Sequence, residues 1–181
     1  MRETQIGKTR LVLEGGSVVN QDVDVIVNAA NEGLWPGGGV SGAIHEAAGP
    51  SVAEECARIG HVPTGRAAIT GGGRLAARFV IHAVGPVWRG GTDGEPELLA
   101  SAYRCSLELA DAHALRSIAF PSIGTGIFGY PRDRAAPLAL ETVVRYLRGA
   151  TGLKVVKFVF YGPHEIEPFE RALEEIVGRR G

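Results

Sequence analysis

The sequence contains few of the residues that mark disulfide-linked, membrane-spanning or nucleic-acid-binding proteins. Only two cysteines, Cys56 and Cys105, occur in 181 residues, and neither has a cysteine or histidine partner at metal-ligand spacing, so we expect reduced, buried thiols and no metal site. No run of about 18 apolar residues could span a bilayer, and residues 1–5 carry no apolar signal core, which predicts a cytoplasmic protein without a membrane partner. The net charge of −1, with both signs interspersed, excludes a broad nucleic-acid-binding surface.

The length and the spacing of apolar residues indicate one α/β domain over residues 1–181. A chain of this length fits one hydrophobic core, since domains commonly have about 100–200 residues. Helical spacing, as in Leu98, Ala102, Cys105 and Leu109, alternates with strand-like runs, which predicts an α/β sandwich. The runs are mostly continuous rather than alternating, which is typical of strands buried on both faces. The expected strands are residues 11–13, 23–27, 67–69, 79–84, 118–120 and 155–161.

Glycine and proline positions indicate some of the boundaries. The glycines at 71–73 lie between two strand-like runs and are interpreted as a hairpin-type turn. Pro137 removes a backbone donor several residues into a helical segment, so we expect that helix to begin near Arg134 with Asp133 as its cap.

The most informative segment joins a strand, a polar turn and a glycine loop. It reads Asp-Val-Ile-Val-Asn-Ala-Ala-Asn over residues 24–31 and is followed by the glycines at 37–39 and a helix-like segment. Such a junction directs unpaired backbone N–H groups and the positive end of a helix dipole at one point, which suits a nucleotide diphosphate. Tight turns explain isolated glycines, but a ligand that approaches bare backbone better explains three in succession.

A second glycine-rich segment, from Ser122 to Tyr130, follows the run at 118–120. Because ligands bind where parallel strands end, this loop is expected to hold the same diphosphate from the opposite side. Gly124, Gly126 and Gly129 also match the dinucleotide fingerprint G-x-G-x-x-G, but the acidic residue expected about 20 residues later is missing. The dehydrogenase interpretation is therefore weak, and no cofactor is expected.

Asn28 and Asn31 stand at the exit of the first glycine-flanked strand. An Asn amide both donates and accepts hydrogen bonds, so the pair suits the hydroxyls of a ribose. Capping of a turn is the alternative for either side chain, and it is weaker for Asn31, which lies nearer the glycine loop.

Four linked motifs resemble the macrodomain family, and most closely its MacroD-type ADP-ribosyl hydrolases. They are residues 24–31, 37–45, 79–86 and 122–131. The resemblance implies a three-layer α/β/α sandwich with a mixed, mostly parallel sheet of about six strands. It also implies that ADP-ribose, or an ADP-ribosylated protein, binds across the strand ends.

The resemblance assigns ligand contacts to both glycine loops. Asn31 would contact the distal ribose, and Phe128 would pack against that sugar. Tyr161 or Phe169 would stack on adenine, although core packing explains Phe169 equally well. The expected ligand-binding residues are Ser17, Val18, Asn28, Gly37, Gly38, Gly39, Val40, Ser122, Gly124, Thr125, Gly126, Ile127, Phe128 and Tyr161.

Two positions depart from the family pattern. Relatives usually carry an aspartate where this chain has Ser17, which can accept a hydrogen bond from adenine only without charge assistance. MacroD-type relatives usually carry a water-orienting aspartate where this chain has Ser41, and a serine hydroxyl positions water but is no base near neutral pH. The expected catalytic residues are therefore Asn31 and Ser41, with Glu32, His45 or a substrate phosphate as the base. A neutral core histidine is an equal interpretation of His45.

The sequence leaves two main functions open. The first is a hydrolase that removes ADP-ribose from acidic protein side chains, or the acetyl group from O-acetyl-ADP-ribose, and it is favoured by the second glycine loop and His45. The second is a non-catalytic ADP-ribose reader, which Ser41 favours. A different nucleotide-like ligand, suggested by Ser17, is a third and weaker interpretation.

Overall fold

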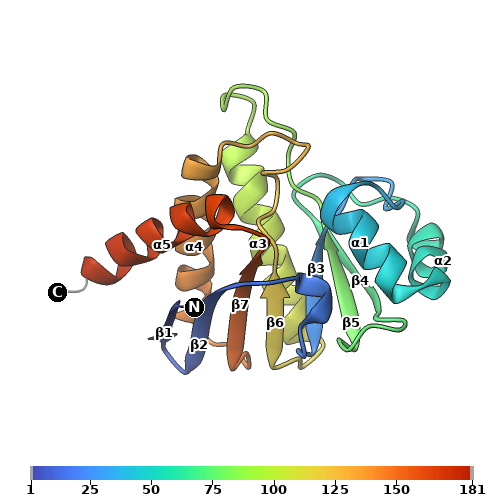
Figure 1. Cartoon of the computed structure of the whole chain (residues 1–181), viewed down its shortest axis with the longest axis horizontal. Coiled ribbons are helices and arrows are strands. Elements are labelled where there is room, and N and C mark those ends of the chain that lie inside the picture. The colour runs from blue at the N-terminus through green and yellow to red at the C-terminus, as the bar shows by residue number, and fades with distance from the viewer. Residues whose placement is uncertain (1, 180–181) are drawn as a thin grey trace.

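A computed structural model describes residues 2–179 of the chain. Within that range the chain forms seven strands, five α-helices and one 3₁₀-helix (Figure 1). None of these helices is long and apolar enough to cross a bilayer. The elements are β1 (Arg2–Ile6), β2 (Thr9–Gly15), η1 (Val18–Asn20), β3 (Val25–Ala29), α1 (Gly39–Ala48), α2 (Pro50–Ile59), β4 (Ala67–Gly71), β5 (Phe79–Ala83), α3 (Glu95–Ala112), β6 (Ser117–Phe120), α4 (Arg132–Leu147), β7 (Val155–Phe160) and α5 (Pro163–Gly178).

The strands form one mixed sheet in the order β1-β2-β7-β6-β3-β5-β4. The five central strands are parallel, whereas the edge strands β1 and β4 are antiparallel to their neighbours. The prediction of a mixed, mostly parallel sheet is confirmed, with one strand more than expected. Sequence reasoning missed β1 because Ile6 is its one buried residue, and an exposed edge strand has no apolar run.

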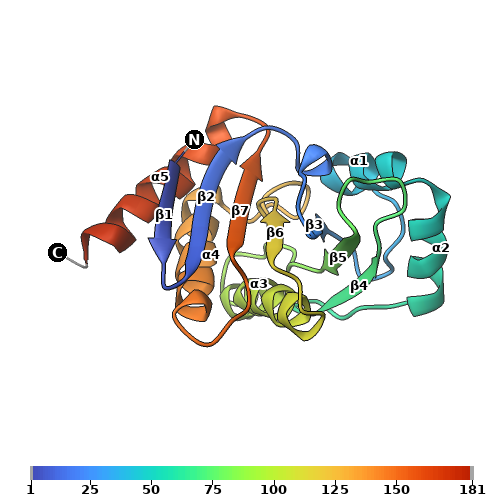
Figure 2. The same cartoon turned by 90° about the horizontal axis from the view of Figure 1, so that it is seen from below.

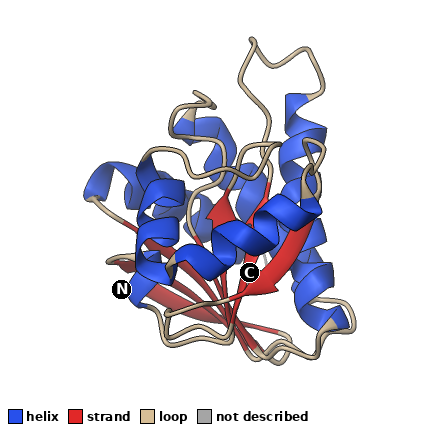
Figure 3. Ribbon diagram, turned by 90° about the vertical axis from the view of Figure 1, so that its right-hand side faces the viewer, coloured by secondary structure: helices blue, strands red, loops and turns tan. Residues whose placement is uncertain are grey.

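Helices cover both faces of the sheet, as the three-layer prediction requires (Figures 2 and 3). Figure 2 shows α3 and α1 on opposite sides of the strands. The side chains of α3, α4 and α5 join alternate strand residues in the largest core cluster. On the other face, η1 and α1 pack around Ile26, Ile44 and Val80, and α2 adds a smaller cluster. This burial from two sides explains the continuous apolar strands.

The helix that contains Pro137 begins earlier than the sequence suggests. α4 starts at Arg132, with Pro131 as its N-cap. The prediction of Asp133 as the cap is wrong, because Asp133 lies inside the first turn of the helix, where Oδ1 of its carboxylate pairs with Nη2 of Arg171 in α5 at 2.9 Å. Pro137 is accommodated inside the helix, where it leaves one backbone carbonyl without its usual donor.

Gly71 ends β4, and Gly72 and Gly73 begin the connection to the antiparallel strand β5, as predicted. The N–H of Gly72 donates to the carbonyl of Arg78 at 2.8 Å. A Cβ at Gly72 would lie 2.1 Å from the carbonyl oxygen of Ala77. Close approach of two backbone segments therefore explains this glycine without a ligand.

A buried carboxylate fixes the loop between β5 and α3. Glu95, the first residue of α3, accepts hydrogen bonds from the backbone N–H groups of Arg89, Gly91 and Asp93 at 2.9, 2.8 and 2.6 Å. Burial alone would raise the pKa of this carboxyl, but the backbone donors outweigh burial and lower the pKa to about 2. The loop is therefore held by one charged group.

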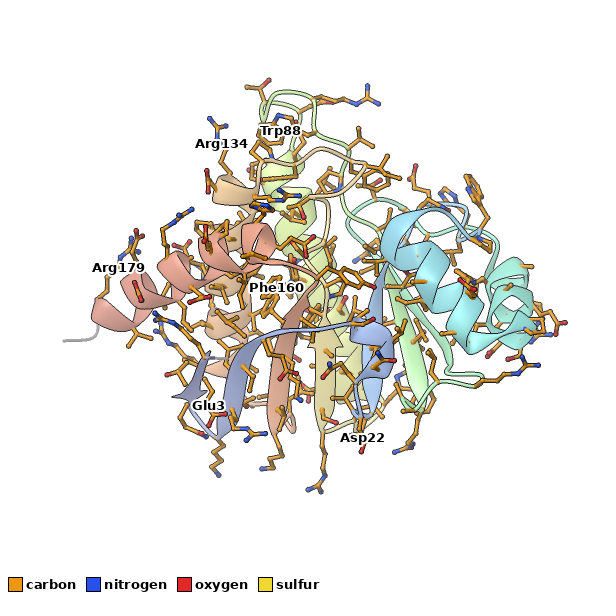
Figure 4. The ribbon with its side chains drawn as sticks, in the orientation of Figure 1. Glu3, Asp22, Trp88, Arg134, Phe160 and Arg179 are labelled. Atoms are coloured by element: carbon orange, nitrogen blue, oxygen red, sulfur yellow. The ribbon has the colours of Figure 1, made fainter. Side chains whose placement is uncertain are left out.

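The same loop carries Trp88, which connects it to the loop after β6. The backbone N–H of Trp88 donates to the backbone carbonyl of Phe128 at 2.7 Å. The centroid of the Trp88 ring lies 4.7 Å from that of the Tyr130 ring. The guanidinium of Arg134 stands over the Trp88 ring at 5.6 Å (Figure 4). The two loops therefore support each other at one edge of the sheet.

We expect Glu95→Gln to loosen the loop before α3. The amide keeps the shape of the side chain but loses the charge and presents an N–H where the carboxylate accepts, so at pH 7 calorimetry should show a Tm lower by several degrees. Because the folded pKa is about 2 and the ordinary value is 4.5, the stabilisation is complete above pH 4.5 and is lost as the pH falls toward 2. The Tm difference between wild type and variant should shrink over that interval, and a constant difference would contradict the assignment.

Candidate functional site

A cleft of about 210 Å³ opens where β3, β5 and β6 end. The connections that follow the parallel strands meet at this edge of the sheet, at the top of Figure 1, as is usual for ligand sites in α/β folds. The residues that line it are Ala29, Ala30, Asn31, Gly37, Gly38, Gly39, Val40, Ser41, Gly85, Ser122, Ile123, Gly124, Thr125, Gly126, Ile127, Phe128 and Glu165.

The first wall of the cleft is the glycine segment that begins α1. Gly38 is the N-cap, and Gly39, the first helical residue, has a φ of +57° that side chains rarely adopt. A Cβ at Gly42 would lie 2.5 Å from the carbonyl oxygen of Gly37, so the chain folds back here only with glycine. The first N–H groups of α1 lack helical partners and, with the helix dipole, favour an anion.

The second wall is the loop between β6 and α4. Gly129 N donates to Gly126 O at 3.0 Å, and Tyr130 N donates to Gly124 O at 2.9 Å. Gly124 and Gly129 have φ values of +84° and +76°, which explains glycine at both positions. Among residues 2–179, the backbone N–H groups from Gly124 to Phe128 find no protein acceptor, so they are available to a ligand.

The cleft favours anions through its backbone rather than through charged side chains. Within the described chain, no lysine or arginine lines it, and its one ionisable side chain is that of Glu165 in α5. The Glu165 carboxylate accepts the N–H of Tyr161 at 3.1 Å. The side chains of Asn31, Ser41 and Thr125 offer neutral polar groups. This arrangement suits a diphosphate flanked by hydroxyl groups.

Asn31 shapes the rim of the first wall. Its Oδ1 accepts the N–H of Trp35 at 3.2 Å, and its Nδ2 donates to the Trp35 carbonyl at 3.0 Å. Leu34, inside the turn, has a positive φ of 58°, and Trp35 is 63% exposed. Asn31 therefore closes a turn and lines the cleft at the same time.

Ser41 connects the cleft to a buried polar chain. Its Oγ accepts a long 3.5 Å hydrogen bond from Nδ2 of Asn28, and that Nδ2 is 3.1 Å from Nδ1 of His82. Nε2 of His82 is 2.9 Å from Oγ1 of Thr70. Burial, followed by repulsion from His45, lowers the pKa of His82 to about 4, so the ring is neutral at pH 7.

Twelve of the residues expected from the sequence line the cleft, and six do not. The twelve are Asn31, Gly37, Gly38, Gly39, Val40, Ser41, Ser122, Gly124, Thr125, Gly126, Ile127 and Phe128. The six are Ser17, Val18, Asn28, Glu32, His45 and Tyr161.

Three of those six have other partners or surroundings. Asn28 is buried and holds Ser41 from behind. Burial lowers the pKa of His45, and neither of its ring nitrogens has a hydrogen-bond partner, so the geometry favours the neutral core histidine over the base. Glu32 is exposed, and its Oε2 accepts the N–H of Thr64 at 3.1 Å.

The remaining three expected residues lie near the β2 and β7 ends. Oγ of Ser17 and the hydroxyl of Tyr161 are 3.4 Å apart, and the backbone of Tyr161 joins the cleft through Glu165. Val18 is buried in η1. Phe169 is also buried, with its ring against Phe160 at 4.7 Å, which leaves Tyr161 as the exposed aromatic of the two proposed for adenine.

Sequence reasoning missed five residues of the cleft, which are Ala29, Ala30, Gly85, Ile123 and Glu165. Four of them lie within the motifs already singled out, so membership of those motifs was the available signal. Glu165 belongs to no motif, and only the turn after β7 brings it to the cleft.

The cysteines also differ from expectation. Cys56 is buried, but Cys105 is only partly buried. Sγ of Cys56 lies 3.6 Å from Nε2 of His82, a neighbour 26 residues away that sequence spacing did not reveal. Burial raises the pKa of the Cys56 thiol to about 11, with a further contribution from the charge of Glu55.

Comparison with known proteins identifies the family. The Macro domain family profile matches residues 27–139, more than half of the chain. The chain belongs to the macrodomain family. A macro domain-containing protein of Caldanaerobacter subterraneus subsp. tengcongensis is 51% identical to this macrodomain over 173 residues, covering 93% of this chain and 98% of the relative. The O-acetyl-ADP-ribose deacetylase of Cronobacter turicensis is 51% identical over 168 residues, covering 91% and 96%.

Solved structures agree with this assignment. A mutant macrodomain of Oceanobacillus iheyensis, solved with ADPR, superposes with a TM-score of 0.93 at 38% sequence identity. The match covers 98% of each chain. The three-layer macrodomain fold expected from the four motifs is therefore confirmed.

We expect Asn31→Ala to release the turn at the rim of the macrodomain cleft. The change removes two hydrogen bonds to the Trp35 backbone, each contributing about 0.5–1.5 kcal/mol, whereas Asn31→Asp removes only the donor. The fluorescence anisotropy of Trp35, measured in a Trp88→Phe background, should decrease from wild type to Asn31→Asp to Asn31→Ala. Asn20→Ala, at an exposed position of η1, is the control, and equal anisotropy in all variants would contradict the role of Asn31.

Proposed function

We propose that this macrodomain binds ADP-ribose and hydrolyses O-acetyl-ADP-ribose, with ADP-ribose esters on acidic protein side chains as further substrates. The observation that carries the proposal is the cleft between two glycine walls, in which the backbone N–H groups from Gly124 to Phe128 find no acceptor among the described residues and the first N–H groups of α1 lack helical partners. A diphosphate is the ligand group that such donors suit. The deacetylase named among the relatives and the ADPR in the structural neighbour support the same ligand.

The size of the cleft indicates which part of the ligand it encloses. Small-molecule sites commonly enclose about 300–1,000 Å³, whereas this cleft has about 210 Å³. We therefore assign the diphosphate and distal ribose to the cleft and the adenine to its open side. There the ring of Tyr161 is exposed for stacking, and Ser17 offers the adenine amino group an uncharged acceptor.

Hydrolysis of the acetyl ester needs an oriented water and donors for the developing charge. Water attacks the acetyl carbonyl carbon, the π electrons move to the carbonyl oxygen, and collapse of this intermediate breaks the bond to the ribose oxygen. Acetic acid, which loses its proton to solvent and becomes acetate, and ADP-ribose are released. The Ser41 hydroxyl orients the water, Asn28 holds that hydroxyl, and the first N–H groups of α1 stabilise the oxyanion.

The proton of the attacking water passes to a phosphate oxygen of the substrate and then to the leaving ribose oxygen. This assignment follows from the side chains that line the cleft. Ser41 holds its own proton too tightly to act as a base, and neither His45 nor Glu32 lines the cleft. Glu165 lines it, but its carboxylate accepts a hydrogen bond from the backbone N–H of Tyr161. An ester is a reactive substrate, so positioning within the cleft supplies much of the acceleration.

Gly126→Glu should abolish binding of ADP-ribose. A carboxylate on the second wall would stand within a few ångströms of the diphosphate, and this repulsion should weaken affinity by at least about 100-fold in calorimetric titrations. Gly126→Ala is the matched control, because a Cβ at Gly126 meets no atom within 4 Å. Retained affinity in a folded Gly126→Glu protein would contradict the placement of the diphosphate between the two walls. Tighter binding of ADP or NAD than of ADP-ribose would identify another ligand.

Release of acetate from O-acetyl-ADP-ribose tests the activity itself, with Gly126→Glu as the control for contaminating enzymes. Wild type should release acetate and Gly126→Glu should not. Ser41→Ala should lower kcat by about 10-fold with little change in KM, because it removes an interaction with the attacking water rather than with the ligand. Binding without any release by wild type would identify a reader instead of an enzyme, and an unchanged kcat would remove Ser41 from the mechanism.

A further inference from the structure

A row of buried polar side chains crosses three neighbouring strands behind the cleft. Thr70 of β4, His82 of β5 and Asn28 of β3 lie on strands that are adjacent in the sheet. Asn28 stands opposite His82 in the register of β3 and β5. On the other side Ala68 stands opposite His82, and Thr70 follows two residues later on the same face. Asn28 shares that face with Ile26, which packs against α1.

A single hydroxyl proton determines the direction of the hydrogen bonds in this row. Oγ1 of Thr70 donates its proton to the carbonyl of Gly71 at 3.0 Å. The same oxygen is 2.9 Å from Nε2 of His82, so there it must accept, and Nε2 must carry the proton. Burial lowers the pKa of His82 to about 4, and a neutral imidazole has only one N–H. Nδ1 of His82 is therefore an acceptor.

The direction set at Thr70 continues to the wall of the cleft. Nδ2 of Asn28 is 3.1 Å from Nδ1 of His82, and because Nδ1 accepts, the amide must donate one of its two N–H groups to it. The same Nδ2 donates to Oγ of Ser41 at 3.5 Å. Ser41 therefore accepts a hydrogen bond from the interior, and its own proton remains for the cleft, which Ser41 lines.

The two other ionisable side chains near His82 leave this direction unchanged. Sγ of Cys56 is 3.6 Å from Nε2 and 4.0 Å from Nδ1 of His82. Because these two distances are so similar, the sulfur is in line with neither ring nitrogen and competes weakly for their hydrogen bonds. The Cys56 thiol also keeps its proton at pH 7, because burial raises its pKa to about 11. The ring centroid of His45 is 6.1 Å from that of His82.

We propose that Thr70 and His82 are positioning residues that hold the Ser41 hydroxyl as a hydrogen-bond donor toward the cleft. Neither of them lines the cleft, so both act through Asn28. Their effect on the rate rests on the proposed hydrolysis, whereas the direction of the hydrogen bonds does not.

A donating Ser41 leaves both protons of the attacking water free for other acceptors. The water oxygen accepts the Ser41 proton with one lone pair and attacks the acetyl carbon with the other. One of the water protons can then point to the phosphate oxygen that acts as the base. If Ser41 accepted a hydrogen bond from the water instead, it would take one of these two protons, and the phosphate would have to compete for the other.

The position of the ring proton of His82 tests the proposal without any substrate. In proton–nitrogen correlation spectra of the histidine rings at pH 7, wild type should carry this proton on Nε2. Thr70→Ser keeps a hydroxyl and should give the same result. Thr70→Val keeps the shape of the side chain but removes the acceptor, so both tautomers should be populated. A wild-type proton on Nδ1 would overturn the proposal and leave the proposed function standing.

Acetate release tests the effect on the reaction. Thr70→Val should lower kcat by about 3- to 10-fold with little change in KM, because it weakens the orientation of one hydroxyl group. Thr70→Ser should keep kcat near the wild-type value, and circular dichroism checks that each variant folds. In a Ser41→Ala background, Thr70→Val should cause no further loss, since its effect passes through Ser41. An equal loss in both backgrounds would show a merely structural role and contradict the proposal.

Discussion

The binding cleft depends on backbone N–H groups that two glycine loops leave free at the carboxyl ends of the parallel strands. The first loop requires glycine because Gly42 approaches the carbonyl of Gly37 too closely for a side chain. The second requires it at Gly124 and Gly129, where φ is positive. Parallel strand order places both loops face to face. The cleft therefore attracts an anion without a lysine or arginine among its described lining residues.

A neutral polar chain supports this cleft from the interior. It extends from Ser41 through Asn28 and His82 to Thr70, and its inner members are buried. Because the pKa of His82 is lowered by burial, the chain positions a hydroxyl group without adding charge to the site. This support fits a site in which Ser41 orients water while the substrate supplies the base.

Sequence reasoning recovered the fold and both glycine loops because these features are local in the chain. The inward position of Asn28 was overlooked, although alternation along β3 places it on the same face as Ile26, toward α1. Strand β1 and Glu165 carry no pattern of their own, since one is an exposed edge strand and the other is positioned only by the turn after β7. The cluster of Cys56 with His82 depends on strand pairing and helix packing, which residue spacing does not encode.

The most direct test of the central claim is a map of backbone amide chemical shifts during titration with ADP-ribose. If the two glycine loops hold the diphosphate through their N–H groups, the largest changes should occur at the amides of residues 37–41 and 124–128. Changes confined to other parts of the chain, or none at saturating ADP-ribose, would contradict the account.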